Sequence, residues 1–401
     1  MVCWSPRTAV LSAKRVGGGG MNRLSTAFHS IQRWLIPDLE EELGELTEKM
    51  REFVRVVEII DLPSFMAPFD WRGVGCPPCG RMSIFKAFIL KAVYDYPTTK
   101  AMIEAVKLSP PLRRLCGWET LGEIPSESTF SRAFAQFAKT GLPSEIHTAI
   151  VTGEIGKDKI AGHVSRDSTA IDAREKAPPK AEAKTAPAAK AGTSNTTPDG
   201  KTLKAKEGAA DTQDTPPAPV EETRLERQKT KAAAENFAEL PTSCDWGAKK
   251  GSKGNKISWK GYKLHIDTID GDVPVNAFLS SASLHDSQVA IPLIQSTSER
   301  ITYLYDLMDS AYDAAAIHEV SGLNNHVPVI DHNQRRGEKR EFDPAKKERY
   351  KERSAAERVN SDLKDNHGGR HVRVKGPAKV FAHLMFGLLV MTVGNLHTML
   401  S

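Results

Sequence analysis

The stretch ERYKERSAAERVNSDLK, residues 348–364, predicts an amphipathic helix with an unusual polar face. Tyr350, Arg353, Glu357 and Lys364 follow one another at steps of three, four and seven residues. On a helix that turns by about 100° per residue, these four side chains lie within an arc of about 60°. The opposite side carries small and apolar residues that would face a core, namely Ala355, Ala356, Val359 and Leu363. One carboxylate therefore shares its helix face with a tyrosine and two cations.

The composition around this stretch is that of a folded, mildly basic protein. The 401 residues suffice for about two or three domains. The chain is 40% hydrophobic and 26% charged, so most of it can fold around a core. Its net charge of +5 and sequence pI near 8.8 are compatible with a nucleic-acid partner. The five cysteines are an odd set without a disulfide framework, which favours a reducing, cytosolic setting.

Two N-terminal features are interpreted without assigning them a function. Residues 1–24 have no continuous apolar region, so we expect a flexible leader rather than a secretory signal. The glycine run 17–20 leaves Met1 and Met21 as alternative starts. Cys76 and Cys79 form a single CxxC pair, whereas a zinc site needs about four ligands. We therefore interpret them as loop cysteines.

Residues 25–155 are predicted to form an all-helical domain. Apolar residues at helical steps indicate helices near 30–60, 84–94, 100–108 and 129–139. The segment SESTFSRAFAQF, residues 126–137, opens with a plausible cap at Ser126. It has two interpretations: a helix-turn-helix that exposes Ser131 and Arg132 to DNA, or ordinary helical packing.

Residues 175–240 and 376–401 differ in character from the rest. The first segment is rich in Ala, Lys, Pro and Thr, and Phe237 is its only aromatic residue. It cannot bury a core, so we expect a low-complexity, disordered insertion with some helix in 222–238. The second is fairly apolar but contains His383, Asn395 and His397. It predicts a buried helix that packs on the catalytic domain, not a membrane span.

The segments 156–174 and 241–375 alternate between strand and helix patterns. Residues 261–268 and 273–280 alternate apolar and polar residues around Asp270-Gly271, which predicts a β-hairpin. The remaining predicted elements follow in chain order: strand 162–171 before the hairpin, then helix 287–299, strand 301–308, helix 314–320, strand 327–330 and helix 348–364. This order predicts an α/β domain with a mixed sheet.

Carboxylates lie where such a sheet would bind a ligand. Asp167 lies within the first strand and Asp309 closes the strand 301–308. Open α/β sheets bind ligands beyond the carboxyl ends of their strands. Together with Glu357, these acids could bind Mg²⁺, and two such ions about 3.5–4 Å apart promote phosphoryl transfer. Asp172 and Asp306 are the alternatives to Asp167 and Asp309.

The polar helix face fits the same chemistry. Arg353 and Lys364 could hold phosphates, and Tyr350 could stack on a nucleotide. Residues 332–375 carry 14 Lys/Arg against 8 Asp/Glu, a local net charge of 14 − 8 = +6. An acidic site beside a basic surface suits a metal-dependent nuclease of DNA. The simpler alternative is a solvated Arg353–Glu357 pair worth a few tenths of a kcal/mol.

With these residues in place, the chain resembles the DDE transposases of bacterial insertion sequences. Their C-terminal signature is Tyr, two residues, Arg, three residues, Glu, six residues, Lys, and residues 350–364 fit every interval. The family's first Asp sits in an Asp-Gly-Thr-like turn, here Asp167-Ser168-Thr169. Its second Asp precedes Gly-Tyr, here Asp309-Ser310-Ala311-Tyr312, so both glycines are replaced. His285-Asp286-Ser287 and the helical region 70–140 are further family-like parts, although His285 and Asp286 could instead cap the following helix.

The resemblance implies a fold and a function. It implies an α/β ribonuclease-H-like catalytic domain, a mixed sheet with flanking helices, after an all-helical N-terminal domain and with a disordered insertion. Asp167, Asp309 and Glu357 would be the catalytic residues and hold two Mg²⁺ or Mn²⁺ ions. The enzyme would cut DNA at the element's ends and join them to target DNA. Tyr350, Arg353, Lys364 and Arg132 would contact DNA.

Further expectations concern partners and rival functions. The resemblance implies that the helical domain recognises terminal inverted repeats. It also implies a homodimer or larger synaptic complex in the bacterial cytoplasm, associated with the nucleoid and with no membrane contact. The replaced glycines and the insertion keep open an inactive, transposon-derived DNA-binding protein. A metal-dependent nuclease without strand transfer is the other alternative.

Overall fold

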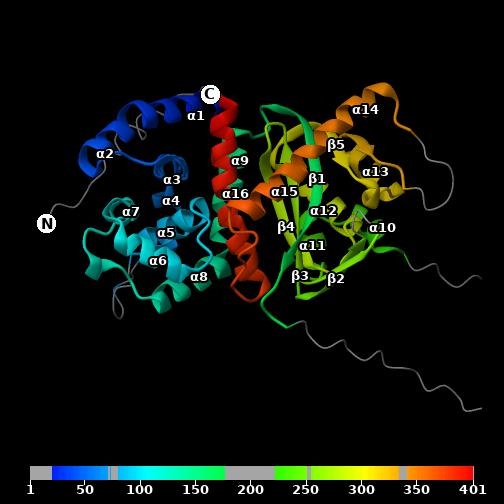
Figure 1. Cartoon of the computed structure of the whole chain (residues 1–401). Coiled ribbons are helices and arrows are strands. Elements are labelled where there is room, and N and C mark those ends of the chain that lie inside the picture. The colour runs from blue at the N-terminus through cyan, green and yellow to red at the C-terminus, as the bar shows by residue number, and fades with distance from the viewer. Residues whose placement is uncertain are drawn as a thin grey trace, which may run out of the picture.

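The computed structural model has a helical half and a sheet half, with one long C-terminal helix between them (Figure 1). It describes residues 20–70, 73, 80–176, 222–250, 254–333 and 341–400. The prediction of a helical first part followed by an α/β part is confirmed. The predictions for residues 1–19, for the middle of the insertion and for the Cys76–Cys79 pair lie outside the described residues.

The helical half agrees with the predicted helices and refines their limits. Its elements are α1 (Gly20–Ser30), η2 (Ile31–Leu35), α2 (Ile36–Leu43), α3 (Glu48–Ile59), α4 (Leu62–Met66), η3 (Ala67–Phe69), α5 (Arg81–Val93), α6 (Thr99–Leu108), α7 (Pro110–Cys116), η4 (Leu121–Glu123), α8 (Glu127–Thr140) and α9 (Leu142–Glu154). The single helix expected near 30–60 is divided, because Gly44 has a φ of +83° and Thr47 caps α3 through the Met50 amide. The expected leader ends earlier than predicted, since residues 20–24 begin α1 and Leu24 is buried.

The sheet is mixed, as predicted. Its strands are β1 (Ile160–Asp172), β2 (Asp245–Lys250), β3 (Lys256–Ile269), β4 (Val273–Ser281), β5 (Thr302–Met308) and β6 (Val327–Ile330). The order β2-β3-β1-β5-β6 has β4 paired with β3 as well. β3 is antiparallel to its neighbours, whereas β1, β5 and β6 are parallel. The predicted hairpin closes at Gly271 and Asp272, which both have positive φ. β2 was not predicted.

Helices cover both faces of this sheet. One face carries α10 (Arg224–Lys229), α11 (Ala233–Ala238), α12 (Ser287–Arg300) and α13 (Ala315–Leu323), as contacts from the buried side of β1 and β3 show. α10 and α11 were expected inside a disordered insertion. Instead the buried Gln228 donates to the Gln288 carbonyl at 2.9 Å, and the buried Asn236 donates to the Gln228 carbonyl at 2.9 Å. Residues 222–240 therefore belong to the fold.

The opening stretch is not one continuous helix, so that prediction is wrong in detail. It comprises α14 (Pro344–Tyr350), the 3₁₀ turn η6 (Lys351–Arg353) and α15 (Ser354–Asn366). The Ser165 hydroxyl of β1 donates to the Glu352 carbonyl at 3.0 Å, which fixes the turn against the sheet. The apolar stripe of α15 packs on β1 and β3, as its burial requires.

The last helix, α16 (Pro377–Leu400), forms the shared core of both halves. Phe386 and Leu389 pack with the helical half, while Leu384 and Leu388 pack with β3, β4 and α15. The buried His147 of α9 lies 3.1 Å from the Pro274 carbonyl of β4 and 3.1 Å from the Thr392 hydroxyl of α16. Within the described part, α16 is the one helix long and apolar enough to cross a membrane, but 78% of its most apolar window is buried. It is thus a core helix, and its contact with the helical half was not predicted.

Candidate active site

Asp167 and Asp309 occupy neighbouring positions on one face of the sheet. β1 and β5 are parallel and pair Ser165 with Leu307. Two residues further along each chain stand Asp167 and Asp309, and adjacent strands lie about 4.8 Å apart. The Asp309 carboxylate also accepts the Ala311 amide at 2.9 Å, which holds the turn after β5 in place. The structure therefore brings together two of the predicted acids.

Both carboxyls lack sufficient positive charge. Burial raises the pKa of Asp167 to about 6, and the charges of Asp309 and Asp286 act in the same direction. Burial likewise raises the pKa of Asp309, with Asp286 and Asp331 adding to it. Arg353 opposes the shift at both sites without cancelling it. Two half-buried carboxyls with raised pKa values are stabilised by a bound cation.

The third predicted acid faces this pair from α15. Glu357 is exposed at 57% of its side chain and forms an ion pair with Arg353. The Arg353 guanidinium lies 5.7 Å from the centre of the Tyr350 ring. Burial lowers the pKa of Arg353, but the charges of Tyr350, Glu357, Asp167 and Asp309 together raise it. Arg353 therefore links the helix-borne acid electrostatically to the two strand-borne acids.

The donor set fits a divalent cation in part. The oxygens of Asp167 and Asp309 are hard ligands of the kind that Mg²⁺ and Mn²⁺ bind. In the part of the chain that the structure describes, no three His, Cys, Asp or Glu side chains are grouped closely enough to hold one ion. Glu357 is instead engaged by Arg353. A three-carboxylate site would therefore require this ion pair to open.

Asn360 is a site residue that the sequence did not single out. It lies on the buried side of α15 and donates to the Asp167 carboxylate at 3.0 Å. Its own Oδ1 is buried and finds no hydrogen-bond partner among the described residues. The available signal was a polar residue beside Val359 on an otherwise apolar stripe. Asn360 thus positions Asp167 and presents an unused oxygen next to it.

Both alternative acids lie elsewhere. Asp306 is fully buried on the opposite face, where it accepts from the hydroxyls of Ser321 at 2.6 Å and Tyr303 at 3.0 Å and lies 3.4 Å from Arg166. Its carboxylate is fully engaged within the core. Asp172 is exposed at the end of β1, away from Asp309. The geometry therefore favours Asp167 and Asp309.

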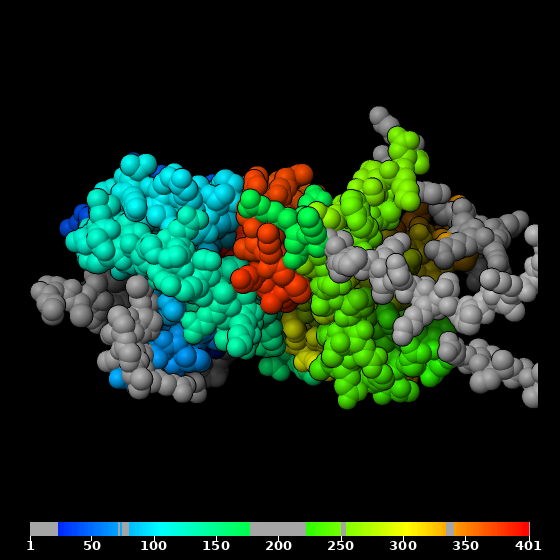
Figure 2. Space-filling model, turned by 90° about the horizontal axis from the view of Figure 1, so that it is seen from below, coloured from blue at the N-terminus to red at the C-terminus, as the bar shows by residue number. Residues whose placement is uncertain are grey.

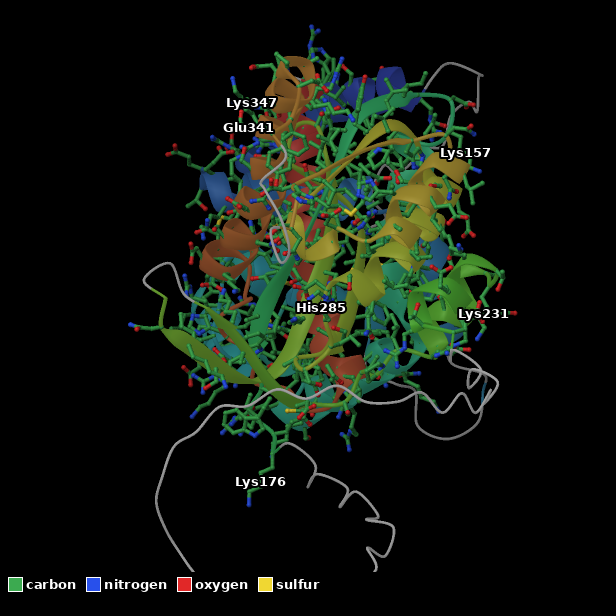
Figure 3. The ribbon with its side chains drawn as sticks, turned by 90° about the vertical axis from the view of Figure 1, so that its right-hand side faces the viewer. Lys157, Lys176, Lys231, His285, Glu341 and Lys347 are labelled. Atoms are coloured by element: carbon green, nitrogen blue, oxygen red, sulfur yellow. The ribbon has the colours of Figure 1, made fainter. Side chains whose placement is uncertain are left out.

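The family-like His285-Asp286 pair has two different structural roles. The His285 Nδ1 accepts the Ser287 amide at 3.4 Å, which is a capping contact as expected. Asp286 makes no capping bond, so that alternative is wrong for it. Its carboxylate instead accepts from Lys263 at 2.9 Å and from Ser168, next to Asp167. Figure 3 shows His285 near the middle of the face formed by the sheet half.

The remaining predicted contact residues lie on the surface. Lys364 is half-buried, and burial lowers its pKa, as do the charges of Lys249 and Arg370. It therefore belongs to a small basic group at the far end of α15 and does not adjoin Arg353. Arg132 is exposed on α8, as expected, and donates to the Thr129 hydroxyl at 3.3 Å.

These features define an enzyme class with carboxylates at the strand ends of a mixed sheet. Two family models match the chain: the Transposase DDE domain over residues 213–393, and a Transposase domain (DUF772) over residues 41–136. The chain belongs to the DDE transposases of insertion-sequence type, and its sheet half is a ribonuclease-H-like DDE domain. No curated protein and no solved structure matches it.

Membership establishes the general activity. The protein is a transposition enzyme that acts on DNA, in a family that generally uses divalent metal ions and is generally soluble and cytoplasmic. The first match includes Asp309 and Glu357 but begins after β1. The role of Asp167 therefore depends on its position beside Asp309.

Proposed function

We propose that this transposase cuts DNA at the ends of an insertion sequence and joins the freed ends to target DNA. Asp167, Asp309 and Glu357 would hold the divalent metal, two Mg²⁺ or Mn²⁺ ions. The main support is the adjacent placement of Asp167 and Asp309 on β1 and after β5, both with raised pKa values. Their unmet demand for positive charge is what a metal site requires before the ion binds.

The metal would lower the pKa of a bound water and stabilise charge on the leaving oxygen. The chain's residues prepare that chemistry. Asn360 holds the Asp167 carboxylate in one orientation through its hydrogen bond. Lys263 holds Asp286 at 2.9 Å and so balances the acid nearest to the site. Outer contacts of this kind commonly change activity 10–100-fold in metal enzymes.

Arg353 would couple DNA binding to completion of the site. It is paired with Glu357 in the DNA-free structure. A DNA phosphate matches the fork of a guanidinium, so it would compete with Glu357 for Arg353. Releasing Glu357 would let its carboxylate turn toward Asp167 and Asp309. The site would then be complete only when DNA is present.

The reaction has two balanced steps. In the first, the oxygen of water bonds to phosphorus while the phosphorus–O3′ bond breaks, which leaves a 3′-hydroxyl and a 5′-phosphate. In the second, that 3′-hydroxyl bonds to a target phosphorus and displaces a target 3′-oxygen. Each step exchanges one phosphoester bond for another or hydrolyses one, so neither needs a redox partner.

DNA contacts would extend beyond the acids. Tyr350, Arg353 and Lys364 would position the transferred strand, and Arg132 with the helical half would recognise terminal inverted repeats. Exposed cations on both halves support this assignment. The assembly would be a homodimer or larger synaptic complex, associated with the nucleoid of a bacterial cell.

The test uses labelled duplexes that carry the inverted repeats flanking the gene, with Mg²⁺ and a target plasmid. Wild type should cut at the repeat end and form joined products. Asp167→Asn, Asp309→Asn and Glu357→Gln should bind the duplex but not cut it, whereas the exposed Asp172→Asn is the matched control and should remain active. Cutting without joining would indicate a nuclease. End binding without any cutting by wild type would contradict catalysis.

A further inference from the structure

A cavity of about 250 Å³ lies between the helical half and the segment that follows α15. Figure 2 shows this segment, in orange-red, between the helices of the helical half and the green end of β1. The lining residues that matter most come from four parts of the chain: Lys91 of α5, Ser131 of α8, Arg174 after β1, and His371 and Arg373 after α15. The cavity is thus built by both halves, away from the carboxylate site.

Lys91 supplies a buried charge to this cavity. Its side chain is only 9% exposed, and the described residues give its ammonium no hydrogen bond or ion pair. Burial lowers the pKa of Lys91 to about 8, although the Asp95 carboxylate acts in the opposite direction. A buried ammonium without a direct partner is costly, and an anionic ligand would remove that cost.

The other lining charges have the same sign. Arg174 and Arg373 are exposed at the rim, and Glu127 is the one acid among the lining residues. His383 is neutral here, because burial lowers its pKa to about 3, and it bonds to the Gly368 carbonyl at 2.9 Å. Three cations therefore face one carboxylate, and the buried one lies within the cavity.

We propose that this cavity binds one phosphate of the DNA backbone, as a second anchor for the strand that enters the carboxylate site. The proposal rests on the proposed function. Guanidinium and ammonium groups are the usual phosphate ligands, and the volume is ample because water occupies about 30 Å³ per molecule. Phe88, Phe134 and Phe386 line the cavity too and would exclude water from the contact.

The distance from the acids gives the anchor a position along the DNA. From Asp167 to Arg174 is seven residues of extended chain, which span at most about 23 Å. From Glu357 to His367 is ten residues, about 15 Å along the helix. A DNA strand advances about 3.4 Å per nucleotide. The anchored phosphate should therefore lie roughly four to seven nucleotides from the phosphate that is cut.

The test replaces one DNA phosphate at a time with a neutral methylphosphonate and measures binding in the absence of divalent metal. With wild type, one or two adjacent positions, roughly four to seven nucleotides from the cut, should weaken binding about tenfold. Lys91→Met and Arg373→Gln should weaken binding to unmodified duplex by a similar factor. They should also be insensitive to substitution at those positions, because the contact is already lost.

Lys107→Met is the matched control, since it removes one exposed lysine charge from the same half without touching the cavity. It should show the wild-type positional pattern. If Lys91→Met and Arg373→Gln keep that pattern as well, the anchor is refuted. Arg373 is exposed, so its variant tests the idea even if Lys91→Met folds poorly.

Two further outcomes are assigned in advance. If inorganic phosphate stabilises wild type through Lys91 while no DNA position depends on Lys91, the cavity is a free-phosphate site and the proposal fails. Cleavage of the unmodified duplex by wild type is measured in parallel. Cleavage with no positional effect refutes the anchor alone, whereas absent binding and cleavage refute the proposed function as well.

Discussion

Two acid clusters lie on opposite faces of β1 and β5, and their charges are balanced in opposite ways. On one face, the buried Arg166 forks onto Asp267 with two 2.7 Å bonds and lies 3.4 Å from Asp306. Despite burial, hydrogen bonds and nearby cations keep the pKa of Asp306 below its usual range. On the other face, Asp167 and Asp309 have raised pKa values.

The contrast separates a structural use of carboxylates from a functional one. Buried charges that serve the fold have their partners supplied by the chain itself, because unpaired buried charge is destabilising. Acids that await a ligand are left short of positive charge. One strand, β1, supplies a residue to each cluster: Arg166 to the first and Asp167 to the second. Successive strand residues point to opposite faces, which is why neighbours can have such different roles.

The largest effect is expected on the carboxylate face. Asp167→Asn should reduce DNA cleavage on the order of a thousandfold or more, because a metal ligand is lost. Its stability at pH 7 should be unchanged or higher, since the raised pKa of Asp167 means that its charge opposes folding there. Cleavage kinetics and urea unfolding of one preparation measure both. A large loss of stability would remove the contrast between the faces.

The opposite result is expected for the core cluster. Arg166→Met should lower the free energy of unfolding by about 3–5 kcal/mol, because it leaves Asp267 and Asp306 buried without their cation. Urea unfolding monitored by circular dichroism measures the change. An equally stable variant would show that the buried network is not what holds this face together.

A smaller effect is expected at the residue that positions Asp167. Asn360→Leu should reduce cleavage about 10–100-fold through loss of the 3.0 Å bond to Asp167, with stability changed by about 1 kcal/mol or less. Asn360→Gln may be compared as the variant that keeps the amide. Normal metal dependence and normal cleavage by Asn360→Leu would rule out the positioning role.

The smallest effect concerns a buried histidine at the junction of the two halves. Burial lowers the pKa of His147 to about 3, and the nearby Arg300 lowers it further. Its contribution to stability is therefore complete above about pH 6.5 and is lost as pH falls toward 3, where the folded form also takes up the proton. His147→Gln should flatten the pH dependence of unfolding by about 1.4 kcal/mol per pH unit in that window. An unchanged slope would contradict this.

The sequence predicted those parts of the fold that depend on local pattern. The hairpin at Asp270-Gly271 and the helix α12 appear as expected, because turn chemistry and periodicity are local. The helix 348–364 did not, because its 3₁₀ turn is held by Ser165, far away in the chain. α10 and α11 were missed because they pack through buried amides, such as Asn236, and not through an apolar stripe.

The candidate site divides in the same way. Asp167, Asp309 and the Tyr350–Arg353–Glu357 spacing were readable from strand ends and residue intervals. Asn360 was not, since its bond to Asp167 joins residues 193 positions apart. The position of Lys364 was misjudged, because the face of an ideal helix was extended through a turn that breaks it.

The central claim is that Asp167, Asp309 and Glu357 hold the metal once DNA has drawn Arg353 away. The most direct measurement is a crystal structure of the enzyme bound to its repeat end with Mn²⁺, located by anomalous scattering. The account predicts Mn²⁺ between the Asp167 and Asp309 carboxylates, with Glu357 turned toward it and Arg353 on a phosphate. Mn²⁺ bound elsewhere, or Glu357 still paired with Arg353 in a complex that cuts DNA, would contradict it.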